Sequence, residues 1–127
     1  MELGYPVAGI RDHESGHKRT TSIAANAHAL AQYAALCQEQ SLVPIVEREV
    51  LMDGSHSIER CEEVTGAALH AVFSALHDQR VWLRRMLLKP NMVVPGSDSG
   101  QRLVVGMFIC GRARCFLSLR DTGWGNR

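Results

Sequence analysis

The fold is decided by the stretch LVPIVEREVL, residues 42–51, whose β-branched side chains predict a strand. Pro44 falls near its start, where a strand tolerates the loss of a backbone N–H. A second apolar run, MLLKPNMV at residues 86–93, predicts another strand, which Pro95 and Gly96 close. Both runs are nearly continuous in apolar residues, as in parallel strands that are buried on both faces. The two runs therefore predict a parallel sheet.

A helical pattern precedes each of these strands. Ser22 can cap a helix over about residues 23–40, where apolar residues recur at three- and four-residue spacing. Ser57 opens a second helix that extends to about residue 79, and acidic residues in its first turns suit the helix dipole. The order helix–strand–helix–strand is typical of α/β proteins. We expect the two strands to be parallel and adjacent, joined by a right-handed crossover.

The chain divides into three segments that differ in polarity and in hydrophobic periodicity. Residues 1–21 are polar and aperiodic, with several Gly and Pro residues, and this predicts a loop or disorder. Residues 22–96 carry the ordered α/β pattern. Residues 97–127 show no helical or alternating period, apart from a candidate strand at 103–110.

The composition excludes several classes of protein. The 127 residues suit one domain, and an apolar fraction of 46% is enough for a core. A net charge of +1 gives no field that would attract nucleic acid or an anionic membrane. No stretch approaches the ~18–20 apolar residues of a membrane span, and the first residues lack the pattern of a signal peptide. We therefore expect a cytoplasmic protein that binds neither nucleic acid nor membrane.

The cysteines and histidines predict no metal site. The four cysteines lack Cys-x-x-Cys spacing, and Cys37 and Cys61 fall in helical patterns where a small buried side chain is expected. His70 and His77 lie on one predicted helix face without a third ligand nearby in the sequence. We expect neither a metal ion nor a cofactor.

Lys89 is the residue that fits its surroundings least, because it interrupts the apolar run at residues 86–93. Burial of an ammonium group is costly, so a buried lysine tends to lose its proton. A neutral, positioned amine is the nucleophile that Schiff-base chemistry needs. The alternative is a lysine at the strand end whose amine reaches solvent. The local sequence leaves both interpretations open.

Glu47 and Glu49 interrupt the first strand in a similar way. Residues two apart on a strand point to the same face, so the two acids share a face near its C-terminal end. Ligands of parallel sheets and barrels bind at that end. A carboxylate beside a lysine can exchange protons during catalysis. The alternative is a polar strand end that meets a loop.

Five segments carry a resemblance to a known family: ANAHALAQYA at 25–34, LVPIVE at 42–47, LMDG at 51–54, IERCEEVT at 58–65 and LLKPNMV at 87–93. Together they resemble the class I fructose-bisphosphate aldolases over about residues 22–96. The resemblance implies the middle of a (β/α)₈ TIM barrel, present in part, because a complete barrel needs ~250 residues. It also implies glycolytic cleavage of fructose 1,6-bisphosphate to glycerone phosphate and glyceraldehyde 3-phosphate.

The resemblance assigns roles to three residues. Lys89 corresponds to the lysine that forms the Schiff base, Glu47 to the glutamate that shuttles protons, and Glu49 to a second acid that lines the site. It implies a sugar phosphate substrate, no metal, and the homo-oligomeric state usual for the family.

Several positions depart from the family's pattern. Arg48 replaces a usual Pro, Ser55 replaces a usual acid, and Arg84-Arg85 replace a common Glu-Gly. Residues 1–21 and 97–127 do not resemble the family.

Three interpretations of the chain's function follow. It is an aldolase fragment that reacts through Lys89, a non-catalytic product of a truncated or frameshifted aldolase reading frame, or a small α/β binding module.

Overall fold

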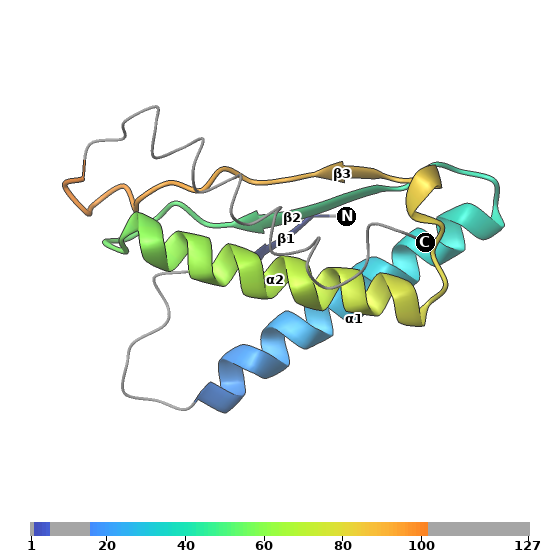
Figure 1. Ribbon diagram of the computed structural model, residues 1–127, viewed down its shortest axis with the longest axis horizontal. Coiled ribbons are helices and arrows are strands. Elements are labelled where there is room, and N and C mark those ends of the chain that lie inside the picture. The colour runs from blue at the N-terminus through green and yellow to red at the C-terminus, as the bar shows by residue number, and fades with distance from the viewer. Residues whose placement is uncertain (1, 6–15, 102–127) are drawn as a thin grey trace.

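The computed structural model describes residues 2–5 and 16–101 (Figure 1). In chain order its elements are β1 (Glu2–Tyr5), α1 (Gly16–Glu39), β2 (Ile45–Val50), α2 (Ile58–Asp78), the 3₁₀ helix η1 (Leu83–Arg85) and β3 (Leu87–Lys89). The described part of the chain is therefore an α/β fold with a small sheet.

The sheet has the order β1-β2-β3, and both pairings are parallel. In the β2–β3 pairing, Ile45 is opposite Leu87 and Glu47 is opposite Lys89. This confirms that the two strands expected from the sequence are parallel and adjacent. Both are shorter than expected, because Pro44 precedes β2 and Pro90 ends β3, and proline has no N–H to donate to a sheet.

The prediction of a loop over residues 1–21 is wrong where the structure describes them. Residues 2–5 form β1, whose Gly4 is tolerated in a short strand, and α1 already begins at Gly16. Ser22 thus lies inside α1 and does not cap it. Residues 6–15 and the candidate strand at 103–110 lie outside the described residues.

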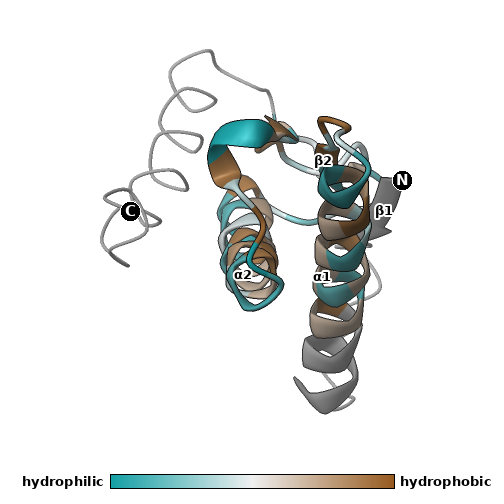
Figure 2. Ribbon diagram, turned by 90° about the vertical axis from the view of Figure 1, so that its right-hand side faces the viewer, coloured by the Kyte–Doolittle hydropathy of each residue, from teal (hydrophilic) through white to brown (hydrophobic). Residues whose placement is uncertain are grey.

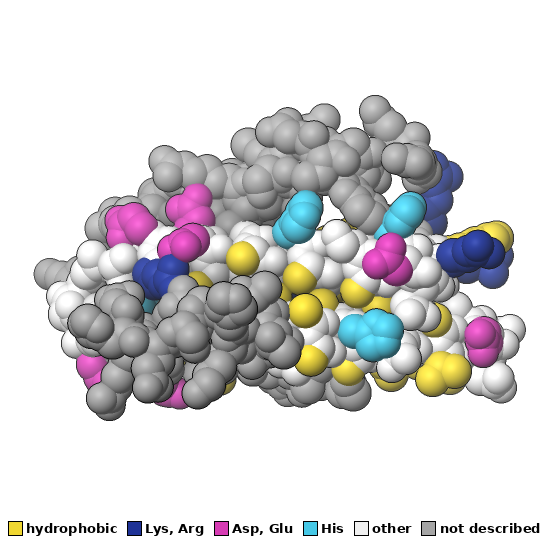
Figure 3. Space-filling view, turned by 90° about the horizontal axis from the view of Figure 1, so that it is seen from below, with side chains coloured by type: hydrophobic (Ala, Val, Ile, Leu, Met, Phe, Trp, Pro, Cys, Tyr) yellow, Lys and Arg dark blue, Asp and Glu magenta, His cyan; other side chains and the backbone are white. Residues whose placement is uncertain are grey.

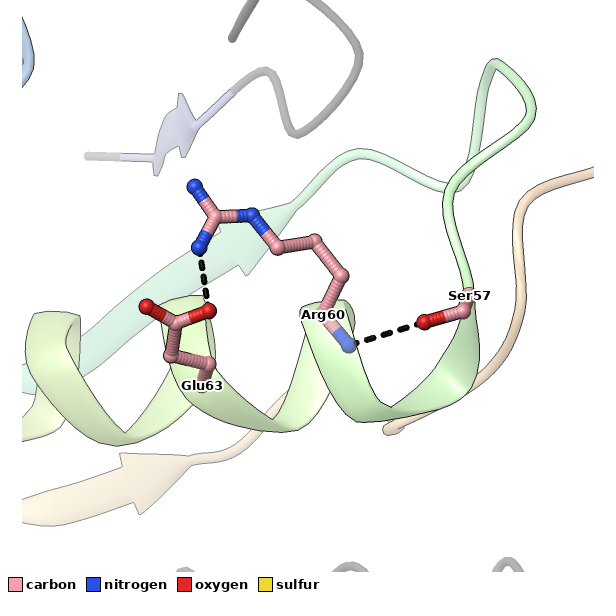
Figure 4. Close-up of polar contacts among 3 residues, drawn as sticks. All are labelled: Ser57, Arg60 and Glu63. Atoms are coloured by element: carbon pink, nitrogen blue, oxygen red, sulfur yellow. Dashed lines mark hydrogen bonds and ion pairs between the residues drawn. The ribbon is translucent and has the colours of Figure 1, made fainter. Parts of the chain in front are cut away.

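The helix α2 begins where its local sequence predicts. The Ser57 Oγ accepts a hydrogen bond of 3.2 Å from the backbone N–H of Arg60, whose guanidinium pairs with Glu63 (Figure 4). The backbone N–H of Glu59 and the Ser57 side chain both hydrogen-bond the Glu59 carboxylate and lower its pKa. These contacts satisfy donors that a helix N-terminus otherwise leaves unpaired.

Both long helices end in the same way, with a non-glycine residue in the left-handed region. Ser41 has φ of 60° and Arg80 has φ of 55°. The next residue then donates to the last helical turn: Leu42 N–H to the Cys37 carbonyl and Val81 N–H to the Leu76 carbonyl, each at 2.9 Å. This is the Schellman pattern of helix termination.

The helices α1 and α2 lie side by side against one face of the sheet (Figures 1 and 2). Val46 of β2 is buried among Leu30 of α1 and Val72 and Leu76 of α2. A second cluster fills the space near the start of α2; its buried members are Val50, Ile58, Cys61, Val64, Leu69 and Val93. Cys61 is buried there as expected, whereas Cys37 is only partly buried.

The outer surface of the helices is mixed in character. It carries acidic and histidine side chains, with apolar groups between them (Figure 3). No helix in the described part of the chain is long and apolar enough to span a membrane.

Candidate functional site

The strand β2 separates two environments. Val46, Arg48 and Val50 are buried on the side of the helices, each at most 2% exposed. Ile45 and Glu47 alternate with them and therefore point to the other face. None of the described helices covers that face, and Ile45 remains 49% exposed and Leu87 of β3 59% exposed.

Lys89 and Glu47 meet on this helix-free face. They are register partners at the C-terminal end of the β2–β3 pairing, and the Lys89 Nζ forms an ion pair with a Glu47 carboxylate oxygen. The Lys89 side chain is 65% exposed and that of Glu47 is 23% exposed. Among the described residues, Lys89 therefore matches the strand-end interpretation of the sequence and not the deeply buried one. Its amine nevertheless lies directly against a carboxylate.

Glu49 lies two residues beyond Glu47 on β2, on the same face by strand alternation. Its Cα is in register with Gly4 of β1, on the side of β2 away from Lys89. Its side chain lies outside the described part of the structure. The fold thus brings Glu47 and Lys89 together and places Glu49 at the neighbouring register position.

A pocket of about 200 Å³ opens beside the ion pair, with residues from the ends of β2 and β3 as its lining: Glu47, Arg48, Val50, Met52, Lys89, Pro90, Asn91 and Met92. The C-terminal ends of parallel strands are the usual place for a ligand in α/β folds. The arrangement offers an amine nucleophile, an adjacent proton acceptor and a concave surface.

Arg48, the departure from Pro, lies among the residues that line this pocket. It is only 1% exposed and belongs to the helix-covered side of β2. The substitution therefore places a guanidinium in the interior and adds no charge to the exposed face that carries Lys89.

The loops that follow β2 and β3 are joined by backbone hydrogen bonds. The carbonyl groups of residues 52, 54 and 56 accept hydrogen bonds of 2.8–2.9 Å from the N–H groups of Ser97, Asp98 and Gly96. A Cβ on Gly96 would lie 2.1 Å from the carbonyl oxygen of Gly54, so only glycine fits there. These bonds connect the two loops at the C-terminal end of the sheet.

Sequence reasoning missed the residues that anchor the segment after Lys89. The Asn91 Nδ2 donates to the Thr65 Oγ1 at 3.4 Å and to the Met92 carbonyl at 2.9 Å. Asn91 and Thr65 stand in the segments LLKPNMV and IERCEEVT, but no local pattern indicates that they meet.

Among the side chains that the structure describes, no group of His, Cys, Asp and Glu has an arrangement that could hold a metal ion. His70 and His77 are both exposed on α2. Cys110 and Cys115 lie outside the described residues.

Comparisons with known proteins agree on one family. A sequence model of the glycolytic class-I fructose-bisphosphate aldolases matches residues 8–108, which extends beyond both ends of the resembling segment 22–96. The match therefore corrects the expectation that residues 1–21 and 97–127 are wholly unlike that family.

Three curated relatives are about equally similar. Fructose-bisphosphate aldolase of Dictyostelium discoideum is 61% identical over 77 residues, which is 61% of this chain and 22% of that protein. A probable class 1 aldolase of Xanthomonas axonopodis is 62% identical over 78 residues, 61% of this chain and 23% of that protein. The cytosolic fructose-bisphosphate aldolase 4 of Arabidopsis thaliana is 59% identical over 78 residues, 61% of this chain and 20% of that protein. The chain thus spans about a fifth of the length of these relatives.

A solved structure is also similar in fold. Fructose-bisphosphate aldolase from Plasmodium falciparum, in complex with TRAP and a small-molecule inhibitor, superposes with a TM-score of 0.82 at 36% identity. The superposition covers 91% of this chain and 32% of that one.

Proposed function

This chain belongs to the class I fructose-bisphosphate aldolase family, and from that premise we propose that it carries the Schiff-base portion of an aldolase site. Lys89 is the nucleophile, Glu47 the proton shuttle, and Glu49 a second acid of the same strand face. The observation that supports this most is the Lys89–Glu47 ion pair at the C-terminal ends of adjacent parallel strands.

We also propose that the chain folds as part of a (β/α)₈ barrel, because β2 and β3 are parallel and adjacent. The order strand–helix–strand–helix–strand corresponds to consecutive units in the middle of a (β/α)₈ barrel, with the helices outside and the strands facing inward. In such a barrel the helix-free face is the interior. Ile45 and Leu87 would then be interior side chains, and the pocket beside Lys89 would belong to the top of the barrel.

Formation of the imine needs only the amine and the carboxylate that line the pocket. Glu47 removes a proton from the Lys89 ammonium, and the amine attacks the C2 carbonyl carbon of fructose 1,6-bisphosphate. The resulting carbinolamine receives the proton back on its hydroxyl oxygen, which leaves as water, and a protonated imine remains. A base, which has no assigned counterpart in residues 22–96, must remove the proton of the C4 hydroxyl. The C3–C4 bond then breaks, its electron pair converts the protonated imine into an enamine, and glyceraldehyde 3-phosphate departs. Protonation of the enamine at C3 restores the imine, whose hydrolysis releases glycerone phosphate.

Turnover by this chain alone is expected to be small. Residues that would clamp the phosphate groups or act as base for C–C cleavage have no assigned counterpart in residues 22–96. Positioning and charge stabilisation supply most of an enzyme's rate. A chain with about a fifth of its relatives' length therefore also fits the second candidate, a non-catalytic product of a truncated or frameshifted aldolase reading frame.

The setting that we propose for the activity is glycolysis in the cytoplasm, with a sugar phosphate as ligand.

Trapping of the imine tests the proposal. Glycerone phosphate with borohydride should reduce the imine and add a fixed mass to the peptide that contains Lys89. Lys18, the other lysine of the chain, is an internal control, and Lys89→Arg should abolish the adduct. Equal labelling of Lys18 and Lys89 in the unmodified chain would contradict the proposal, because Lys89 would then have no special reactivity.

A further inference from the structure

The segment that follows Lys89 is fastened to α2 at two points. Asn91 donates through Nδ2 to the Thr65 Oγ1, and the Met92 carbonyl oxygen lies 4.0 Å from the Cys61 Sγ. Cys61 and Thr65 are one helical turn apart, at 1% and 2% exposure, so both contacts lie on the same buried face of α2. The chain directly after the proposed nucleophile is therefore anchored to the core.

The Asn91 amide supports this anchor from within the pocket. Asn91 lines the pocket next to Lys89, and its Nδ2 also donates to the Met92 carbonyl at 2.9 Å. Its Oδ1 is buried without a hydrogen-bond partner among the described residues. A buried acceptor without a partner is unfavourable, so the stabilising contribution of this side chain lies in its two donated hydrogen bonds.

The anchor acts directly beyond the hydrogen-bonded end of β3. The strand is only three residues long, Lys89 is its last residue, and Pro90 cannot continue the hydrogen bonds of the sheet. An exposed lysine side chain has many rotamers, and an exposed ion pair contributes little by itself. Strand register places Lys89 opposite Glu47, and the contacts of the next residues limit how far the end of β3 can move from that position.

We infer that Asn91 is a positioning residue, which holds the Lys89 amine against Glu47 through its hydrogen bond to Thr65. The inference rests on the proposed function of Lys89, because positioning matters only if the amine reacts. Misplacement of a reacting group by about 1 Å can reduce the rate by ~100-fold. Loss of one of several anchors is expected to reduce it by ~10-fold.

The test compares the full chain with Asn91→Ala, Thr65→Val, the double variant and Thr65→Ser. The Asn26→Ala variant, which removes an amide on α1, is the matched control. The first measurement is the ratio of borohydride-trapped Lys89 to Lys18 with glycerone phosphate. The second is the ratio of Lys89 to Lys18 acetylation by acetic anhydride, which needs no imine and reports whether Glu47 holds the ammonium; Glu47→Gln calibrates it.

We expect Asn91→Ala and Thr65→Val to lower the trapping ratio by ~10-fold each. The double variant should match the single variants, and Thr65→Ser should keep most of the ratio because it keeps the hydroxyl. Acetylation of Lys89 should rise in Asn91→Ala in the direction of Glu47→Gln and stay unchanged in Asn26→Ala.

The two measurements separate the two claims. If Lys89 acetylation rises in Asn91→Ala while the full chain traps no imine, the result supports the positioning role and refutes the proposed chemistry. Acetylation that responds to Glu47→Gln but not to Asn91→Ala overturns the positioning role. An unchanged acetylation ratio in Glu47→Gln, or an equal effect of Asn26→Ala, overturns it as well.

Discussion

The pairing of Lys89 with Glu47 is a result of strand register more than of attraction between the two charges. An exposed ion pair contributes about 0–1 kcal/mol, which is too little to define a geometry. The parallel pairing of β2 with β3 places the two Cα atoms opposite each other before the side chains meet. The residues that set this register are therefore as important to the proposed site as the two ionisable groups.

Tyr33 provides a prediction at the level of one residue. Its pKa is raised above 10.0, first by a side-chain hydrogen bond with Cys37 and then by burial, while a backbone hydrogen bond from Ile45 acts in the opposite direction. A raised pKa means that the folded chain keeps this proton when the unfolded chain has lost it. Stability should therefore fall as the pH rises above about 10, through the pKa of the folded state.

The absorbance of tyrosinate during alkaline titration checks this prediction. The chain has two tyrosines, so Tyr5→Phe leaves Tyr33 as the only signal. Its midpoint should lie above 10 and should fall when Cys37→Ala is added. A midpoint that does not change on loss of the Cys37 thiol would show that the hydrogen bond is not the main cause.

The sequence predicts individual residues only where their signal is local. Lys89, Glu47 and Glu49 stand out because each interrupts an apolar strand, and the structure brings the first two together. The Asn91–Thr65 contact joins residues 26 apart in the chain, and neither residue is unusual where it stands. Such a contact depends on how β3 packs on α2, which no window of sequence reports.

The same distinction applies to whole elements. The start of α2 is predicted because Ser57 makes its capping hydrogen bond within three residues. The strand β1 is missed because its four residues include a Gly, and only its pairing with β2 makes it a strand. The sequence predicts β2 and β3 to be longer than they are, because apolar residues continue beyond the hydrogen-bonded ladder into the loops.

The left-handed residue after α2 provides a prediction at the level of an element. The φ of 55° at Arg80 is unfavourable for any residue with a Cβ, by about 1–2 kcal/mol. Glycine removes that cost but loses more entropy on folding, so Arg80→Gly should stabilise the chain by about 0.5–1 kcal/mol. The midpoint of urea unfolding measures the change.

Two variants control for this effect. Ser41→Gly has the same position after α1, with φ of 60°, and should stabilise similarly. Asp78→Gly lies within the last turn of α2 and should destabilise by about 1 kcal/mol. Destabilisation by Arg80→Gly would show that the arginine side chain makes contacts that outweigh the backbone strain.

At the scale of the whole molecule, the asymmetry of the two sheet faces is the dominant feature. Both helices cover one face, and the face with Ile45 and Leu87 has no cover from any described element. Exposed apolar faces and open strand edges promote association. We therefore predict that the chain self-associates in solution.

Sedimentation velocity over a range of concentrations tests this prediction. The double variant Ile45→Thr, Leu87→Thr places a polar, β-branched residue at both strand positions and should increase the monomer fraction. Leu36→Thr changes a residue of α1 that is 61% exposed and should have a smaller effect. A wild-type chain that sediments as a monomer at all concentrations would contradict the prediction.

The joined loops at the C-terminal end of the sheet have a consequence for how this region tolerates sequence change. Three backbone carbonyls and three backbone N–H groups hold the loops together, and backbone groups are the same in every residue other than proline. Positions 52, 56, 97 and 98 can therefore diverge widely while the shape around the pocket persists. Gly54 and Gly96 are the exceptions, because Gly54 has a φ of 107° that a side chain would strain, and any side chain at Gly96 meets the Gly54 carbonyl. In a library of random substitutions across both loops, depletion should concentrate at these two positions.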